Sequence, residues 1–341
     1  MKKLKGVCIG AGYFGHFQYE AWNRIPEVEI IAFCDLDEEK RKTISEKYGI
    51  ETSYEDWREM LDKEQPDFVD VITPPPTHFE MCTEAAKRGI HIICQKPLAG
   101  SFEKAKELVA NCSNVRLMIH ENFRYQPWHR EIKRQIEAGA IGTPFSLNMR
   151  SRMGDGWGDT PYTPRQPYFC DYPRLLIYET GIHFIDTFRY LMGDIEEVDC
   201  WLRQLNPVIK AEDCGLMIIR HNNGCLSTWD ANRYNEPPTG TKARYTFGEM
   251  LVEGSKGSLR LHTDGKIDYQ ALGESAVTLD YEHHDRGFAG DCPYACQRHF
   301  VDCMLDGSEF ETSGQDYLKN MEAQQAIYEA ATKHGWKIPT E

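Results

Sequence analysis

Val-Cys-Ile-Gly-Ala-Gly-Tyr-Phe-Gly, residues 7–15, is a short apolar run followed by glycines in the spacing G-x-G-x-x-G. The apolar run predicts a buried strand, and the residues after Gly15 predict a helix. Such a turn is typical of dinucleotide-binding units, because its glycines let the backbone approach a pyrophosphate at the helix N-terminus. Asp35 stands twenty residues after Gly15, at the end of the next predicted strand, where an acid accepts hydrogen bonds from the adenosine ribose.

The residues around Asp35 indicate which dinucleotide is bound. Asp37 follows closely, and no Arg or Lys stands beside Asp35 to receive a 2′-phosphate. NAD is therefore favoured over NADP. The alternative is a glycine turn that only packs a helix on a strand, and the agreement between the turn and Asp35 argues against it.

The rest of the first 121 residues extends this pattern of short apolar runs and amphipathic stretches. It predicts a Rossmann domain, a doubly wound parallel sheet with right-handed crossovers. Gly49 and Gly89 stand where glycines end helices, and Ser101 stands where a helix begins. The expected strands cover residues 7–9, 28–34, 68–72, 90–94 and 116–119, and the helices include 13–24 and 37–48.

After residue 121 the pattern changes, because strands follow one another without helices between them. Asn223-Gly224 between two of these strands is a strong hairpin signal. We expect a second α/β domain with a largely antiparallel sheet, so that the domains are residues 1–121 and 122–341. Its expected helices are 127–137, 175–192, 294–305 and 316–332, and its strands are 145–149, 198–205, 214–220, 225–230, 245–252 and 258–261.

Composition and charge exclude several classes of protein. The chain of 341 residues carries a net charge of −14, which disfavours nucleic acid or an anionic membrane as partner, since both need a cationic surface. No apolar run approaches the roughly 20 residues of a membrane helix. The twelve cysteines are scattered through predicted strands and helices, as is typical of reduced, buried thiols, and their spacing does not favour a metal site. The sequence predicts a cytoplasmic protein without a metal.

Three further motifs carry groups suited to chemistry. Residues 73–78 and 94–97 follow predicted strands, so we expect both at the carboxyl edge of the parallel sheet, where ligands bind. The second segment places Lys96 at that edge. Glu179 and His183 are four residues apart in an expected helix and therefore share one face. Taken singly, each motif also has a plain structural explanation, such as a connector, a solvated lysine or a surface helix pair.

In combination, these motifs make the chain similar, over nearly its whole length, to the glucose-fructose oxidoreductase / inositol dehydrogenase (Gfo/Idh/MocA) family. The resemblance implies an N-terminal Rossmann domain, a C-terminal α/β domain that often mediates oligomerisation, and an enzyme acting on sugars or polyols with NAD(H) or NADP(H). A homodimer or homotetramer is expected. The segments that carry the resemblance are residues 10–15, Thr73-Pro74, Lys96-Pro97, 122–125, 139–142 and Gly181-x-His183-x-x-Asp186.

Within this resemblance, the family's Lys of Glu-Lys-Pro and its Asp-x-x-x-His pair map onto Lys96, Glu179 and His183. The sequence departs from the pattern twice, because Gln95 replaces a Glu and Glu179 replaces an Asp. We expect His183 to act as the base and Lys96 to stabilise the developing alkoxide. Glu179 would hold the substrate or favour protonated His183.

The expected cofactor-binding residues are Gly10, Gly12, Tyr13, Phe14, Gly15, Asp35, Thr73, Pro74, His78, Gln95 and Lys96. The expected substrate-binding residues are Asn122, Tyr125, Trp157 and Arg165. The loop 152–174 is rich in aromatic residues and arginines, which suit a sugar ring and an anionic group. A folded surface loop or an oligomer contact explains this composition equally well.

The predicted reaction transfers a hydride between nicotinamide and a hydroxyl or ketone of a sugar, sugar acid or polyol, in either direction. Two alternatives stay open. One is glycoside cleavage through transient oxidation by a retained NAD. The other is a non-enzymatic, NAD-binding regulator, against which the joint presence of Lys96, Glu179 and His183 argues.

Overall fold

The computed structural model describes residues 3–163 and 165–338. The chain forms two compact units, each described separately below. One unit comprises residues 1–122 and 292–321, and the other comprises residues 123–291 and 322–341.

The segment 292–321 belongs to the first unit, whereas the sequence placed it in the second domain. Its helix α8 (Cys292–Asp306) packs on α1 (Gly15–Trp22). The ring of Phe300 in α8 lies 6.2 Å from the ring of Trp22 and 5.1 Å from that of Phe68. Burial of these rings joins the segment to the Rossmann core, a contact between distant parts of the chain that periodicity does not reveal.

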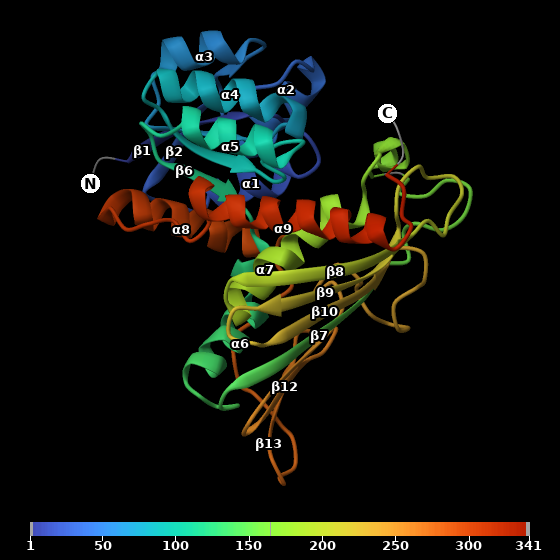
Figure 1. The fold of residues 1–341 in the computed structure, drawn as a ribbon. Coiled ribbons are helices and arrows are strands. Elements are labelled where there is room, and N and C mark those ends of the chain that lie inside the picture. Colours follow the sequence, from blue (N-terminus) through green and yellow to red (C-terminus); the bar gives the residue numbers. More distant parts are fainter. Residues whose placement is uncertain (1–2, 164, 339–341) are drawn as a thin grey trace. The chain divides into compact units, whose positions relative to one another are not determined.

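The first unit is built on a six-stranded parallel sheet in the order β3-β2-β1-β4-β5-β6. Strands β1, β2 and β6 of this sheet are labelled in Figure 1. The order reverses between β1 and β4, so right-handed crossovers put helices on both faces. The Rossmann prediction is confirmed. The strands are Leu4–Ile9, Val28–Cys34, Ser53–Tyr54, Phe68–Val71, His91–Gln95 and Leu117–His120 for β1 to β6, and the helices are Glu38–Tyr48, Trp57–Glu64, Pro75–Lys87 and Phe102–Asn111 for α2 to α5.

Several predicted helix ends of this unit are confirmed. Gly49 and Gly89 adopt left-handed backbone angles, with φ of 72° and 73°, and the Ser101 hydroxyl accepts a hydrogen bond from the backbone of α5. The elements β3 and α3 were not predicted. The strand has two residues, and the helix has eight residues capped by Asp56, so neither leaves a long periodic signal.

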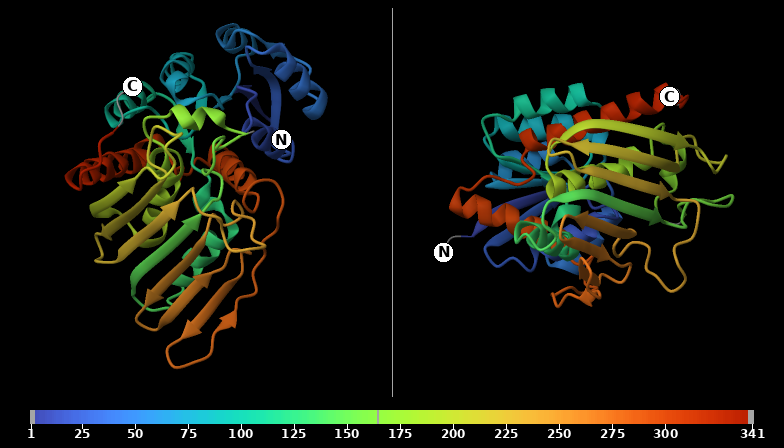
Figure 2. Two further views of the ribbon diagram at one scale, coloured as in Figure 1. Left: turned by 90° about the vertical axis from the view of Figure 1, so that its right-hand side faces the viewer. Right: turned by 60° about the horizontal axis from the view of Figure 1, so that its bottom comes forward.

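The second unit contains an eight-stranded sheet in the order β14-β13-β12-β11-β7-β10-β9-β8. Figure 2 shows its strands side by side. The turn at Asn223-Gly224 joins β9 to β10 as predicted, and Gly224 has a φ of 84°. The strands β7 to β14 are Pro144–Arg152, Ile195–Arg203, Cys214–His221, Leu226–Asn232, Glu249–Gly254, Gly257–Leu261, Ile267–Ala271 and Val277–Thr278.

The prediction of a largely antiparallel sheet is confirmed, with one parallel pair. Strands β7 and β10 run parallel, whereas the other neighbouring strands run antiparallel. Strand β7 is the first strand of this unit along the chain, and yet it is inserted between β10 and β11. Consecutive strands alone do not reveal such an insertion.

The helix expected over residues 175–192 consists of two different parts. Residues Leu176–Gly181 form the π-helix η3, and Ile182–Met192 form the α-helix α7. The helix α6 (Pro127–Glu137) has its predicted bounds. The other helical segments of this unit are η1 (Phe123–Tyr125), η2 (Pro167–Asp171) and the second part of α9 (Gly314–Lys333).

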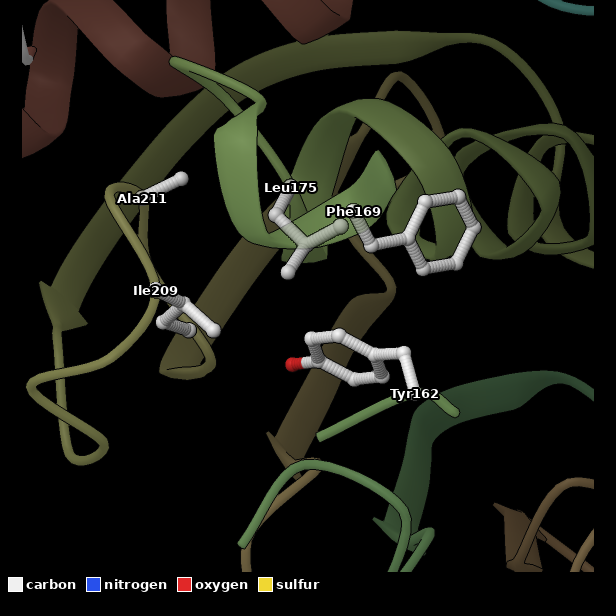
Figure 3. Packing of buried hydrophobic residues seen from close by; sticks show 5 residues of the cluster. All are labelled: Tyr162, Phe169, Leu175, Ile209 and Ala211. Carbon is white, nitrogen blue, oxygen red and sulfur yellow. The ribbon is translucent and has the colours of Figure 1, made fainter. Parts of the chain in front are cut away.

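The loop after β7 is a folded structure with its own apolar cluster (Figure 3). The ring of Tyr162 lies 5.6 Å from that of Phe169 in an edge-to-face arrangement, and both are buried with Leu175. Leu175 directly precedes η3, so the cluster fixes the loop next to the start of this π-helix. Of the two interpretations of the loop's aromatic residues, Tyr162 and Phe169 support a folded loop rather than an open sugar-binding surface. The cluster is completed by Ile209 and Ala211.

Candidate functional site

The glycine turn between β1 and α1 has room for a ligand against its backbone. Gly10 has a φ of 110°, and a Cβ there would lie 3.0 Å from the carbonyl carbon of Ile72, so this position requires glycine. A Cβ on Gly12 would meet no atom of the chain within 4 Å; the protein's own packing therefore does not explain this glycine, and approach of a phosphate does. The third glycine of such a turn is expected to let the helix pack closely on the strand. A Cβ on Gly15, however, would make only an ordinary 3.5 Å contact, so close packing does not require glycine there.

The carboxylate of Asp35 joins the glycine turn to the end of β2. One oxygen accepts a 2.7 Å hydrogen bond from the backbone N–H of Ala11, and the other accepts one of 2.9 Å from Asp37. Arg41, one turn into α2, donates to the carbonyl of Asp35 at 2.7 Å. The sequence reading considered only cations adjacent to Asp35 and missed this one. Its guanidinium binds the backbone carbonyl and not the carboxylate of Asp35.

His78 connects the two turns at the carboxyl edge of the sheet. Its Nε2 lies 2.7 Å from the carbonyl oxygen of Thr73, and its Nδ1 lies 3.1 Å from that of Pro97. The ring is fully buried, and burial lowers its pKa. His78 therefore holds the turn that begins at Thr73 and Pro74 against the turn that carries Lys96. Tyr13, another residue that the sequence assigns to the cofactor site, is 48% exposed.

Gln95, at the end of β5, belongs to a buried polar network. Its Oε1 accepts a hydrogen bond from the backbone N–H of Lys96 at 3.2 Å, and its Nε2 donates to Oε1 of Gln18 at 2.6 Å. The same Nε2 lies 3.3 Å from Nδ1 of His120, whose ring packs 6.2 Å from that of Phe14. The amide that replaces the expected Glu is thus fully hydrogen-bonded within the first unit.

The ring of His183 is held in place by stacking. It lies 3.9 Å from the ring of Phe123, with only 4° between the two planes. Arg124, the next residue, forms a buried ion pair with Asp186 in α7 at 2.6 Å. This ion pair ties η1 to α7, so the Phe123 ring and the His183 ring stay face to face. Tyr125 is also buried and lies beneath the guanidinium of Arg130.

Glu179 lies in the π-helix η3, so the simple one-face relation to His183 expected for an α-helix does not hold. π-turns are rare and are often found at functional sites. Gly181 is the last residue of η3, two residues after Glu179. A Cβ on Gly181 would lie 3.0 Å from the ring of Trp229. The close approach of η3 to the sheet explains this glycine.

The π-helix is fixed by a buried carboxylate that the sequence reading missed. Glu212 accepts hydrogen bonds from the backbone N–H groups of Leu175 and Ile177, both at 3.2 Å, and from the hydroxyl of Tyr328 at 2.5 Å. The Tyr328 oxygen in turn accepts a hydrogen bond from the N–H of Tyr178. These contacts satisfy N–H groups at the start of η3 and so determine where Glu179 lies.

The pH dependence of stability tests the state of Glu212. Burial raises its pKa to about 7 from an ordinary 4.5, although hydrogen bonds from Tyr328 and the backbone oppose the shift. The unfolded chain then loses this proton at lower pH than the folded chain, so the folded state loses stability as the pH rises from about 4.5 to about 7. Glu212→Gln should flatten this decline in urea unfolding at pH 5, 6, 7 and 8. An unchanged slope would contradict the assignment, and Glu282→Gln, at an exposed glutamate of the same unit, is the matched control.

The arginines of the 152–174 loop are already engaged with the protein. Arg152 forms an ion pair with Asp230 at 2.8 Å, and Arg165 pairs with Asp155 at 3.3 Å. The guanidinium of Arg174 lies 4.9 Å above the ring of Tyr328. These contacts do not favour recognition of an anionic substrate by the loop. Trp157 is 54% exposed, and its indole N–H binds Glu236.

Two features are absent from the described part of the chain. Within residues 3–163 and 165–338, no group of three or more His, Cys, Asp or Glu side chains is arranged to hold a metal ion. In the same ranges, no helix has the length and apolarity needed to cross a membrane.

Comparison with known proteins extends these observations. Residues 4–123 match the model of an oxidoreductase family with an NAD-binding Rossmann fold, and residues 129–260 match the C-terminal domain of the same Gfo/Idh/MocA family. D-apiose dehydrogenase of Paraburkholderia graminis is 34% identical over 97% of this chain and 88% of its own length. D-apiose dehydrogenase of Rhizobium rhizogenes is 32% identical over 97% of this chain and 96% of its own length.

A solved structure is also similar to this chain over almost its whole length. An oxidoreductase from Agrobacterium radiobacter, in complex with NAD⁺, L-tartaric acid and magnesium, is 31% identical and has a TM-score of 0.89, with 98% of this chain and 97% of that chain covered. The likeness in sequence and fold thus extends along almost the whole length of both chains. The chain is an NAD-dependent oxidoreductase and belongs to the Gfo/Idh/MocA family.

Proposed function

We propose that the protein is a dehydrogenase that transfers a hydride from a hydroxyl of a neutral sugar or polyol to NAD. The observation that carries this proposal is the match to two D-apiose dehydrogenases over 97% of the chain. The engaged arginines of the 152–174 loop support a neutral substrate rather than a sugar acid. The names of these relatives favour neither glycoside cleavage nor a non-enzymatic regulator.

We assign NAD to the carboxyl edge of the parallel sheet. Gly10, Gly12 and the N-terminus of α1 would hold the pyrophosphate, and Asp35 would bind the adenosine ribose. Bound NAD supplies the hydride acceptor. His78 would keep the Thr73-Pro74 turn and the Lys96 turn in register. The remaining proposed contacts are Tyr13, Phe14, Gly15 and Gln95.

We assign the proton chemistry to three side chains. His183 accepts the hydroxyl proton, since an imidazole is the side chain best suited to this task near neutral pH. Lys96 donates a hydrogen bond to the same oxygen and stabilises its developing negative charge. Glu179 holds the substrate or stabilises protonated His183. Asn122, Tyr125, Trp157 and Arg165 are proposed to line the substrate.

A substrate screen tests the proposed function directly. NAD reduction at 340 nm is measured with D-apiose, inositols, aldoses, glycosides and L-tartrate, and bound cofactor is identified by mass spectrometry. We expect NADH to form with D-apiose or another neutral sugar or polyol. Release of an aglycone from glycosides without net NADH would contradict the proposal and would indicate glycoside cleavage.

The preference for NAD is expected to depend on Asp35. Asp35→Asn removes the negative charge that faces the ribose hydroxyls, so we expect NADH affinity to fall by about 10- to 100-fold, as loss of a charged hydrogen bond of roughly 1.5–3 kcal/mol requires. NADPH affinity should stay constant or rise. Fluorescence titration measures both, with Asp37→Asn as the control. Equal NADH affinity in wild type and Asp35→Asn would refute the assignment.

We also propose a homodimer or homotetramer and a cytoplasmic location. The outer face of the second unit's sheet exposes Trp201, Leu216 and Leu226, which are 41%, 39% and 47% accessible, and a second copy of the chain would cover them. The cysteines of the described residues are free thiols, which suits a reducing compartment. Leu216→Lys should shift the mass measured by light scattering towards the monomer. A monomeric wild type would contradict this proposal.

A further inference from the structure

A chain of buried polar side chains runs through the first unit, from the middle of β4 to the turn that carries Lys96. It begins at Asp70, which is fully buried. The Nε2 of Gln18, from α1, donates to both oxygens of this carboxylate, at 3.0 and 2.8 Å. The indole N–H of Trp22, one turn further along α1, donates to the same carboxylate at 2.8 Å.

The chain continues through two amides. The Oε1 of Gln18 accepts the 2.6 Å hydrogen bond from Nε2 of Gln95, and Oε1 of Gln95 accepts the 3.2 Å hydrogen bond from the N–H of Lys96. The Gln95 amide nitrogen also faces Nδ1 of His120 at 3.3 Å. Every hydrogen bond in the chain from Lys96 to Asp70 therefore points in one direction.

This direction follows from the charge at its inner end. A carboxylate has no proton to donate, so Gln18 must turn its NH₂ group to Asp70 and its oxygen to Gln95. Gln95 must then turn its NH₂ group to Gln18, which leaves its oxygen for the N–H of Lys96. If Asp70 carried no charge, the amides could reverse, and the NH₂ group of Gln95 would face the N–H of Lys96 without an acceptor between them.

We propose that Asp70 is a positioning residue, which acts through Gln18 and Gln95 to hold the backbone of Lys96 in its working position. This inference rests on the role proposed above for Lys96. It also explains the amide at position 95. A glutamate there would need a donor from Gln18, whose NH₂ group is already bound to Asp70, and it would bury a second negative charge one side chain away.

The surroundings of Asp70 agree with a single buried charge. Burial raises its pKa to about 7, and hydrogen bonds from Trp22, Gln18 and Gln297 oppose this shift. The other ionisable groups that interact with it are Cys8, Tyr19 and Cys94, whose own pKa values are raised by burial and by Asp70. These groups stay neutral at pH 8, where the Asp70 carboxylate predominates.

A charge-exchange cycle tests the proposal at pH 8. In Asp70→Asn/Gln95→Glu, the new Asn can accept from Trp22 and Gln297 and donate to Gln18, and Gln18 can then donate to the new Glu. His120 faces position 95 through Nδ1 and can donate to the new Glu in its Nδ1–H form, so the network is again satisfied. We expect each single variant to lower kcat by about 10-fold and the double variant to recover to within about threefold of wild type, a coupling typical of residues in one network. The thermal midpoints without cofactor should show the same recovery.

Two outcomes would overturn the proposal. If the two single effects multiply in the double variant, the residues act independently. If the thermal midpoints are coupled but kcat stays at the wild-type value in all variants, the network stabilises the fold without positioning Lys96. Should Asp70→Asn fail to fold, Gln95→Met interrupts the chain without changing charge. It is expected to lower kcat by about 10-fold, and a wild-type kcat would overturn the proposal.

Lys96→Met separates this inference from the proposed function. A wild-type rate in that variant would remove the role of Lys96 and would leave the coupling of the thermal midpoints as an independent result. NADH affinity is measured for every variant. It should stay within about threefold of wild type in Asp70→Asn, because neither Asp70 nor Gln18 is proposed to bind NAD, and within about tenfold in the variants of Gln95 and Lys96, which are expected NAD contacts.

Discussion

Lys96→Met is expected to lower kcat by about 10²- to 10³-fold, the usual cost of removing one donor that stabilises a developing oxyanion. The methionine retains most of the length of the side chain but has no charge and no N–H. The substrate oxygen would then develop negative charge without this partner. Steady-state NAD reduction with the best sugar from the screen measures the loss.

The control for this prediction is a lysine on the surface of the same unit. Lys104 lies in α5 and pairs with Glu107 at 3.0 Å, so Lys104→Met should leave kcat unchanged. NADH affinity of Lys96→Met should remain within about tenfold of wild type, because the adenosine and pyrophosphate contacts are retained. Turnover at the wild-type rate would refute the assignment of Lys96.

His183→Asn is expected to lower kcat by about 10²- to 10⁴-fold, the range observed when a general base is removed. Hydride departure from carbon requires that the hydroxyl proton leave as well, and asparagine does not accept a proton near neutral pH. The stacking on Phe123 fixes the imidazole, so the loss should appear in kcat more than in KM.

Phe123→Leu provides a second measurement of the same site. It removes the stacked ring and leaves the imidazole present, so the loss of kcat should be smaller than that of His183→Asn. His262→Asn, at an exposed histidine paired with Asp268, is the matched control. If His183→Asn retained wild-type turnover, the base would have to be another group.

The parts of the fold that could be predicted from the sequence are those with a local signal. Gly10, Gly49 and Gly224 all have positive φ angles, which favour glycine and so leave a local signal in the sequence. The features that could not be predicted depend on contacts between distant residues. The assignment of α8 to the first unit, for example, follows from the packing of Phe300 on Trp22 and Phe68.

The same distinction applies to the candidate site. The resemblance to the family predicts roles for Lys96, Glu179 and His183, but it does not reveal the residues that fix their positions. Glu212 is next to Asp213, just before a predicted strand. Polar residues are common at such a position, so the sequence does not indicate that Glu212 is buried. The π-helical form of 176–181 depends on this buried carboxylate, on Tyr328 from α9 and on the close approach to Trp229, none of which leaves a periodic pattern.

The departure at position 95 illustrates why a single residue can be misread. Replacement of a glutamate by Gln95 suggests the loss of a useful charge beside Lys96. The hydrogen bonds instead connect Gln95, through Gln18, to the buried carboxylate of Asp70. Asp70 stands within an apolar strand in the sequence. Burial of an acid is costly unless it is hydrogen-bonded. Its position in that strand therefore indicates that Asp70 has buried hydrogen-bond partners.

The central claim is that Lys96 and His183 act on one hydroxyl oxygen, and a crystal structure with NADH and the best sugar tests it most directly. We expect Nζ of Lys96 and a ring nitrogen of His183 both to lie within about 3.2 Å of the same substrate oxygen, as proton transfer and oxyanion stabilisation require. A complex in which either group binds a different oxygen, or no part of the sugar, would contradict the account.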